Sequence, residues 1–244
     1  MARRPGPAIA VVVAIALAAT ACTASATWSP PPLRVEPVTA AAPAPVNRPV
    51  RFLGRVSRIG PQLRARLVGR NWRPGCPVPI GDLRVVWVTY RTFDGGAARG
   101  PLVVNARVAH DVLSVFRTLY RARFPVHRIG LPPRYRPPRR IDWFSTRDLT
   151  SSYNCRPATG NPGSLSQHSY GWAIDINPLE NPYVGPDGKV LRRAAKPFLD
   201  RARHARGMIH AGDVVVRAFA AIGWRWGGDW HTLKDYMHFS LTGR

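Results

Sequence analysis

Two short clusters of the sequence carry the side chains best suited to chemistry. One cluster contains His168 and Asp175, and the other, further along the chain, contains Asp235 and His238. Two imidazoles and one carboxylate are nitrogen and oxygen ligands that suit Zn²⁺, and three such ligands leave a fourth tetrahedral position for water. His168, Asp175 and His238 are therefore candidate ligands of an open, hydrolytic zinc site.

A hydrolytic site also needs a base. Zinc lowers the pKa of a bound water toward about 7, and a neighbouring carboxylate takes the proton and later passes it to the leaving amine. The chain has only two Glu residues, Glu36 and Glu180, and both lie in Pro-rich stretches. The base is therefore expected to be Asp235, provided that a turn or bulge brings its side chain to the same place as that of His238.

Spacing alone leaves a plainer interpretation open. The chain contains seven His residues, so accidental pairs are common, and an isolated His168 or His238 is also typical of a hydrogen-bonded structural histidine. From the residues alone, a metal site and a structural role stand as alternatives.

The two clusters resemble the motifs of a family of zinc peptidases that comprises D-alanyl-D-alanine carboxypeptidases and L-alanyl-D-glutamate endopeptidases. The first motif, Ser-x-His-x-x-Gly-x-Ala-x-Asp, is matched by Ser166, His168, Gly171, Ala173 and Asp175; the second, Asp-x-x-His-Phe, is matched by Asp235, His238 and Phe239. The resemblance implies that His168, Asp175 and His238 bind zinc and that Asp235 is the catalytic base. It also implies that Arg156, in the loop before the first motif, binds substrate. Ser166, like Arg156, is predicted to bind substrate.

The resemblance covers roughly residues 70–242 and implies a fold. The family shares its core with lysostaphin-type enzymes and the hedgehog signalling domain, so we expect a single α+β domain with a small antiparallel sheet flanked by helices. Two departures stand out: Ser240 replaces a frequent acidic residue after His-Phe, and Met237 replaces a frequent Pro. Neither removes a ligand, although Ser240 changes the expected support around the site.

Local patterns agree with an α+β class. Residues 83–90 are β-branched and aromatic and predict a strand, a turn follows at 94–96, and 102–104 predicts the returning strand. Apolar residues at three- and four-residue spacing predict a helix from the capping Asn105 to about Arg121 and another over 213–222. Short strands are expected near 171–176, 224–226 and 238–241, and residues 130–164 read as a long irregular loop.

The N-terminal part predicts export. A cationic start and an apolar run over 8–19 form a signal peptide that is too short to span a bilayer. Small residues before Cys22 predict a lipoprotein signal over 1–22 with Cys22 lipidated; cleavage near residues 24–26, giving a secreted protein, is the alternative. Residues 23–50 are Pro/Ala-rich and predict a tether. We leave 51–69 unassigned and place the peptidase domain at 70–242.

With Cys22 set aside, Cys76 and Cys155 remain as an even pair in an oxidising compartment, which predicts a disulfide between them. Zinc ligation by these cysteines is the weaker alternative, because neither has a second Cys or His at the spacing typical of such sites.

The chain carries 36 Lys and Arg residues against 13 acidic ones, a formal net charge of +23. The cations are scattered and no nucleic-acid-binding pattern accompanies them, so an anionic cell envelope is the expected partner rather than nucleic acid. We expect a monomer that acts on peptidoglycan stem peptides and reaches the membrane through a lipid anchor if Cys22 is acylated. The peptide bond that is cut and any role of His231 stay open, and an inactive envelope-binding domain of the same fold is the alternative function.

Overall fold

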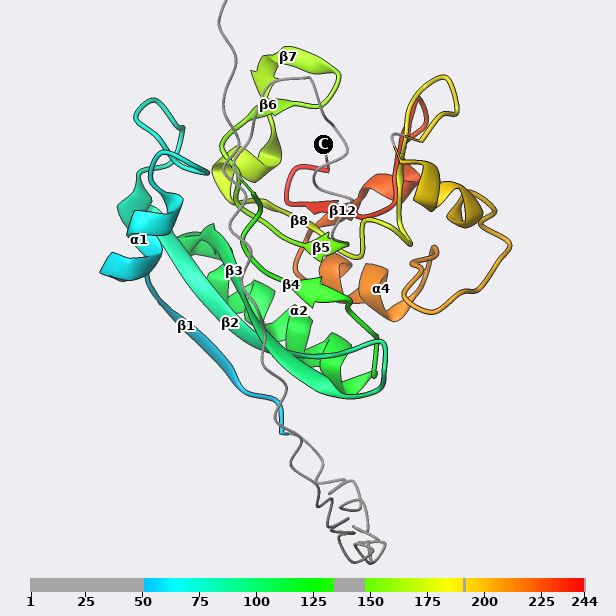
Figure 1. The fold of residues 1–244 in the computed structure, drawn as a ribbon, viewed down its shortest axis with the longest axis horizontal. Helices are drawn as coiled ribbons and strands as arrows, with labels where there is room; N and C mark the ends of the chain where they lie inside the picture. Colours follow the sequence, from blue (N-terminus) through cyan, green and yellow to red (C-terminus); the bar gives the residue numbers. More distant parts are fainter. Residues whose placement is uncertain (1–50, 134–147, 191, 244) are drawn as a thin grey trace, which may run out of the picture. The chain divides into compact units, whose positions relative to one another are not determined.

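The computed structural model describes residues 51–133, 148–190 and 192–243. The predicted signal peptide with Cys22 and the predicted tether lie outside these residues. Within them, the chain folds as a mixed α and β domain with small antiparallel sheets and few helices, which confirms the predicted α+β class (Figure 1).

The largest sheet is an antiparallel meander in the order β1-β2-β3. It consists of β1 (Gly54–Arg58), β2 (Leu83–Arg91) and β3 (Ala97–Asn105). The predicted hairpin is present, and its turn is closed by the Gly96 amide, which donates to Asp94 Oδ1 at 3.1 Å. Strand β1 comes from the segment that the sequence left unassigned, and it pairs with β2 from Gly54↔Val88 to Arg58↔Arg84. Residues 51–69 are therefore part of the domain.

Helix α2 (Ala109–Arg121) lies across one face of this sheet (Figure 1). Its apolar stripe, Val112, Val115, Phe116 and Leu119, is buried, while His110 and Asp111 are exposed. The predicted helix start at Asn105 needs one correction. Asn105 caps a 3₁₀ turn over Ala106–Val108, accepting from the Arg107 amide at 3.1 Å, and the α-helix proper begins at Ala109.

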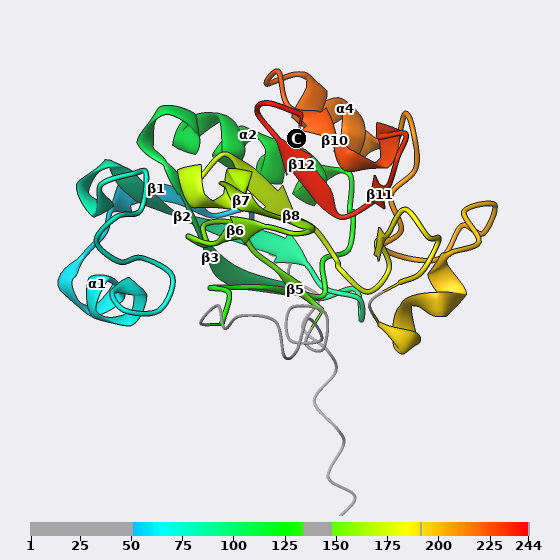
Figure 2. The same cartoon turned by 90° about the horizontal axis from the view of Figure 1, so that it is seen from above.

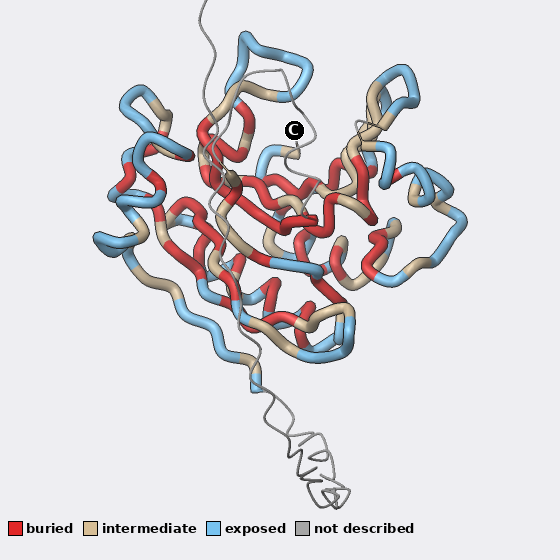
Figure 3. Tube along the Cα trace, viewed as in Figure 1, coloured by how far each residue is buried: buried red, intermediate tan, exposed pale blue. Residues whose placement is uncertain are grey.

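A second small sheet has the strand order β10-β12-β8 (Figure 2). Its strands are β10 (Arg225–Trp226), β12 (His238–Ser240) and β8 (Ala173–Asp175). Helix α4 (Val214–Ala220) packs on it through Phe219, whose ring stacks on Phe239 with centroids 4.2 Å apart. One buried cluster joins both sheets and both helices, so the second sheet is anchored rigidly in the core (Figure 3).

The remaining elements are short. Helix α1 (Pro61–Leu67) follows β1, β4 (Arg128–Ile129) pairs in parallel with β5 (Leu149–Thr150), and β9 (Tyr183–Val184) pairs with β11 (Lys234–Asp235). Strands β6 (Pro157–Ala158) and β7 (Asn161–Leu165) form a hairpin inside the segment expected to be irregular. The other 3₁₀ turns of the described residues are Ile80–Asp82, Gln167–Tyr170, Arg193–Phe198 and Gly227–Asp229. Among the described helices, none has the length and apolar character needed to cross a membrane.

Candidate metal centre

Two of the three predicted ligands lie on neighbouring strands of the second sheet, and the third lies on the turn before them. Asp175 ends β8 and His238 begins β12, and the register of these antiparallel strands places the two residues directly opposite each other. Residues opposite each other on antiparallel strands project from the same face of the sheet. His168 lies on the 3₁₀ turn Gln167–Tyr170, just before β8. Side chains far apart in the sequence are thereby brought to one point.

The distances between the three side chains fit a common metal ion. His168 Nε2 lies 3.1 Å from Asp175 Oδ2, and His238 Nδ1 lies 3.2 Å from Asp175 Oδ1. One ligand atom from each residue can be chosen so that all lie within 4.8 Å of one another. Ligands about 2.1 Å from a tetrahedral ion are separated by about 3.4 Å. His168, Asp175 and His238 therefore form a cluster that can hold a metal ion.

Hydrogen bonding fixes which nitrogen of His168 faces this cluster. Nδ1 lies 2.7 Å from the Ser152 carbonyl oxygen, and since a carbonyl only accepts, Nδ1 carries the proton. Nε2 is buried and lies 3.1 Å from Asp175 Oδ2, so this nitrogen faces the carboxylate of the cluster. Metal-binding histidines are commonly oriented in this way, with the second nitrogen held by a carbonyl.

The charge states of the ligands also favour metal binding. Burial lowers the pKa of His168, against the opposing effect of Asp175, and keeps the imidazole neutral. Burial alone would raise the pKa of Asp175, but the two imidazoles outweigh it and lower the pKa below its usual value. Neutral imidazoles and an ionised carboxylate are the forms that bind metal.

The turn that the sequence required between Asp235 and His238 is present. A turn at Tyr236–Met237 separates it, on β11, from His238 on β12. The Trp226 indole donates to the Tyr236 carbonyl at 2.8 Å and supports this turn. Burial raises the pKa of Asp235 to about 7; the charge of Asp175 adds to the rise, while His238 and Arg156 oppose it. A carboxyl with this pKa can exchange a proton near neutral pH.

Arg156 and Ser166 flank the β6–β7 hairpin close to the cluster. The positive charge of Arg156 lowers the pKa of both His168 and Asp235, which puts the guanidinium within electrostatic reach of each. Its Nη1 donates to the Pro157 carbonyl at 3.0 Å and to the Thr159 hydroxyl at 3.2 Å. Ser166 is buried, and its hydroxyl accepts from the His168 amide at 3.4 Å. Ser166 thus caps the turn that carries His168, and its assignment to substrate binding stays a prediction.

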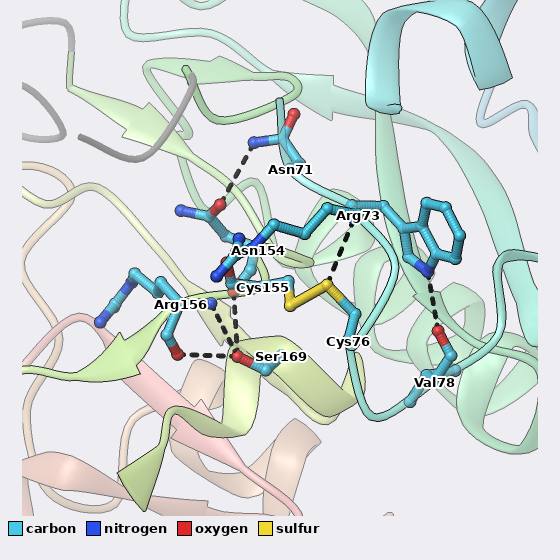
Figure 4. Close-up of a disulfide and its surroundings, with 9 residues drawn as sticks. Asn71, Arg73, Cys76, Val78, Asn154, Cys155, Arg156 and Ser169 are labelled. Carbon is cyan, nitrogen blue, oxygen red and sulfur yellow. Dashed lines mark hydrogen bonds between the residues drawn. A yellow bond between two sulfur atoms is a disulfide. The ribbon is translucent and has the colours of Figure 1, made fainter. Parts of the chain in front are cut away.

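Cys76 and Cys155 form a disulfide in the structure, with Cα atoms 6.0 Å apart (Figure 4). That separation lies in the usual range for disulfides. The bond ties the residue immediately before Arg156 to the loop that follows α1. Neither cysteine belongs to the cluster of candidate metal ligands.

Two serines around the cluster were not found from the sequence. Ser152 holds His168 through its carbonyl. Ser169 is fully buried beside Arg156. His231, whose role the sequence left open, is exposed. The sequence carried no signal for Ser152, because a contact made by the backbone leaves no signature in residue type.

Comparison with known proteins supports the same interpretation of the site. Residues 159–241 match the family model described as D-alanyl-D-alanine carboxypeptidase, a segment that contains both motifs and begins three positions after Arg156. The match supports the resemblance predicted from the two motifs. No solved structure matches the chain.

Proposed function

We propose that the protein is an exported, zinc-dependent peptidase that hydrolyses the stem peptides of bacterial peptidoglycan. The observation that carries the proposal is the convergence of His168, Asp175 and His238, within electrostatic reach of Asp235, whose carboxyl pKa burial raises to about 7. Two nitrogens and one oxygen with a vacant fourth direction form the ligand set of hydrolytic zinc sites. The family match supports a peptidase.

The chain's own residues supply the remaining chemistry. A zinc ion held by the three ligands would act as a Lewis acid and make water nucleophilic near neutral pH. Asp235 accepts the proton of the attacking water and returns it to the leaving amine, which its raised pKa allows. Arg156 binds a carboxylate of the stem peptide, since its planar guanidinium can make two parallel hydrogen bonds. Burial of the ligands strengthens each of these electrostatic contacts.

Two cleavage sites are compatible with this machinery. The description of the matched family favours removal of the terminal D-alanine by a D,D-carboxypeptidase. The Asp-x-x-His-Phe pattern of Asp235, His238 and Phe239 is instead that of the endopeptidase-like branch, which favours an L-alanyl-D-glutamate-type cut. Mass spectrometry of the products from a defined muropeptide separates them, because the first releases a single D-alanine and the second splits the stem.

The decisive test compares Asp235→Asn with a matched control. Asp111→Asn removes an equivalent carboxylate on the exposed face of α2. We expect Asp235→Asn to keep its zinc and lose stem-peptide hydrolysis by about 10²- to 10⁴-fold, while Asp111→Asn keeps both. Zinc binding without hydrolysis in the wild-type protein would instead support the alternative of an inactive envelope-binding domain.

The location of the protein follows from the same proposal. Peptidoglycan lies outside the cytoplasm, so the enzyme must be exported, and a net charge of +23 favours binding to an anionic envelope. The proposed lipid on Cys22 would hold the domain at the membrane surface. Cell fractionation of the wild type and Cys22→Ser tests this part: release of only the variant into the medium is the expected result.

A further inference from the structure

The residues between β5 and β6, Ser151–Arg156, form a connector that is attached to the candidate metal ligands along its length. Ser151 exchanges two backbone hydrogen bonds with Asp175, of 2.9 and 3.1 Å. The Ser152 carbonyl holds His168 Nδ1, and the Asn154 amide donates to the His168 carbonyl at 3.1 Å. The connector therefore takes its position from the residues that build the metal cluster, and Arg156 is its last residue.

Ser169 fixes that last residue directly. Its side chain is fully buried, and its hydroxyl accepts from the Arg156 amide at 2.9 Å and donates to the Arg156 carbonyl at 2.8 Å (Figure 4). The same carbonyl also accepts from the Ser166 amide at 3.1 Å. Both backbone polar groups of Arg156 are thus bonded to the turn that carries His168, one residue away from the ligand itself.

The disulfide holds the connector from the opposite side. Cys155 is bonded to Cys76, its amide donates to the Asn71 carbonyl at 2.9 Å, and its carbonyl accepts from Arg73 Nη1 at 2.9 Å (Figure 4). The backbone at Cys155 and Arg156 is therefore clamped between the loop after α1 and the ligand-bearing turn. The long, flexible side chain of Arg156 therefore starts from a fixed backbone position.

We propose that Ser169 is a positioning residue that holds the backbone of Arg156 at a set distance from the metal ligands, with the Cys76–Cys155 disulfide as the opposing support. This inference rests on the proposed function, in which Arg156 binds a substrate carboxylate. Binding groups must be held to within a fraction of an ångström for productive alignment. Loss of the hydroxyl removes the acceptor of the Arg156 amide and leaves the Arg156 carbonyl with the Ser166 amide alone, so the guanidinium samples positions that do not meet the substrate.

The test is a double-mutant cycle on stem-peptide hydrolysis with Ser169→Ala and Arg156→Ala. We expect Ser169→Ala to raise KM about tenfold with unchanged zinc content and a smaller change in kcat. In the Arg156→Ala background the same change should leave KM within about twofold, since there is no guanidinium left to position. Ser164→Ala, an exposed serine on β7, is the matched control and should change neither constant.

An equal rise in KM in both backgrounds, or no rise in either, overturns the role of Ser169. If Ser169→Ala does not fold, Arg73→Ala, which removes the side-chain donor to the Cys155 carbonyl, replaces it in the cycle: Arg73→Ala should raise KM in the wild type and not in Arg156→Ala, and equal effects overturn the proposal. A wild-type protein that cleaves no stem peptide refutes the proposed function and this inference with it, whereas an active wild type with additive effects refutes the inference alone.

Discussion

Reducing the Cys76–Cys155 disulfide should remove a large part of the stability of the domain. The two cysteines are 79 positions apart. In the chain-entropy model a bridge across a loop of this length restricts the unfolded chain by about 15 cal/mol/K, or about 4.5 kcal/mol at 25 °C. Domains of this size are stable by only about 5–15 kcal/mol. We therefore expect the reduced protein to be close to its limit of stability at room temperature.

The assay is urea unfolding of the oxidised and the reduced protein, followed by tryptophan fluorescence at a fixed excess of zinc. The zinc concentration must be held constant because metal binding itself stabilises the folded state. The double variant Cys76→Ser/Cys155→Ser is the control, and its unfolding should not respond to the reductant. A difference below about 1 kcal/mol between the oxidised and reduced proteins would refute the reasoning, since the loop-closure effect expected for this separation would then be missing.

Three further predictions concern single residues. His168→Ala should lose both bound metal and hydrolysis, and full activity in this variant would reject its assignment as a ligand. Gly171→Ala should destabilise the fold by more than about 1–2 kcal/mol, because φ at Gly171 is +69° and the new Cβ would lie 2.5 Å from the Asn105 amide nitrogen. Gly69→Ala is the control in thermal unfolding. Its φ is +74° but the space around it is open, so this variant should lose clearly less stability. Burial and the neighbouring carboxylate raise the pKa of Glu180 to about 8. Between pH about 4.5 and about 8 the folded state thus retains a proton on Glu180 that the unfolded state releases. The contribution of Glu180 to the free energy of unfolding is therefore greatest below pH about 4.5 and falls as the pH rises to about 8. Glu180→Gln should flatten this fall, and parallel curves of stability against pH for the wild type and the variant would contradict the shift.

The sequence predicted the elements that have a strong periodic pattern. Strand β2 and helix α2 were found because their buried faces repeat with the period of a strand and of a helix, as Val86, Val88, Val112 and Val115 show. Strand β1 was left unassigned, because its residues are half-buried or exposed and three of the five are Arg or Gly. Hairpin β6–β7 was missed for the same reason: β7 is exposed throughout, so its pairing with β6 leaves no apolar pattern.

The candidate site divides in the same way. His168, Asp175, Asp235 and His238 were found because their chemistry and spacing form a motif. Their supports could not be found, because they act through the backbone or through small side chains. The Ser152 carbonyl orients His168, and any residue type supplies a carbonyl. The path that joins Arg156 to the ligands depends on which segments lie side by side, and only the fold specifies that.

The measurement that tests the central claim most directly is X-ray absorption at the zinc edge of the purified protein. The account predicts one zinc ion per chain with nitrogen and oxygen ligands at about 2.0–2.2 Å, and loss of this signal in a variant with Asp175→Ala. Imidazole scattering from two histidines, His168 and His238, should be visible in the same spectrum. A protein that binds no zinc, or one whose zinc environment contains sulfur or is unchanged by Asp175→Ala, would contradict it.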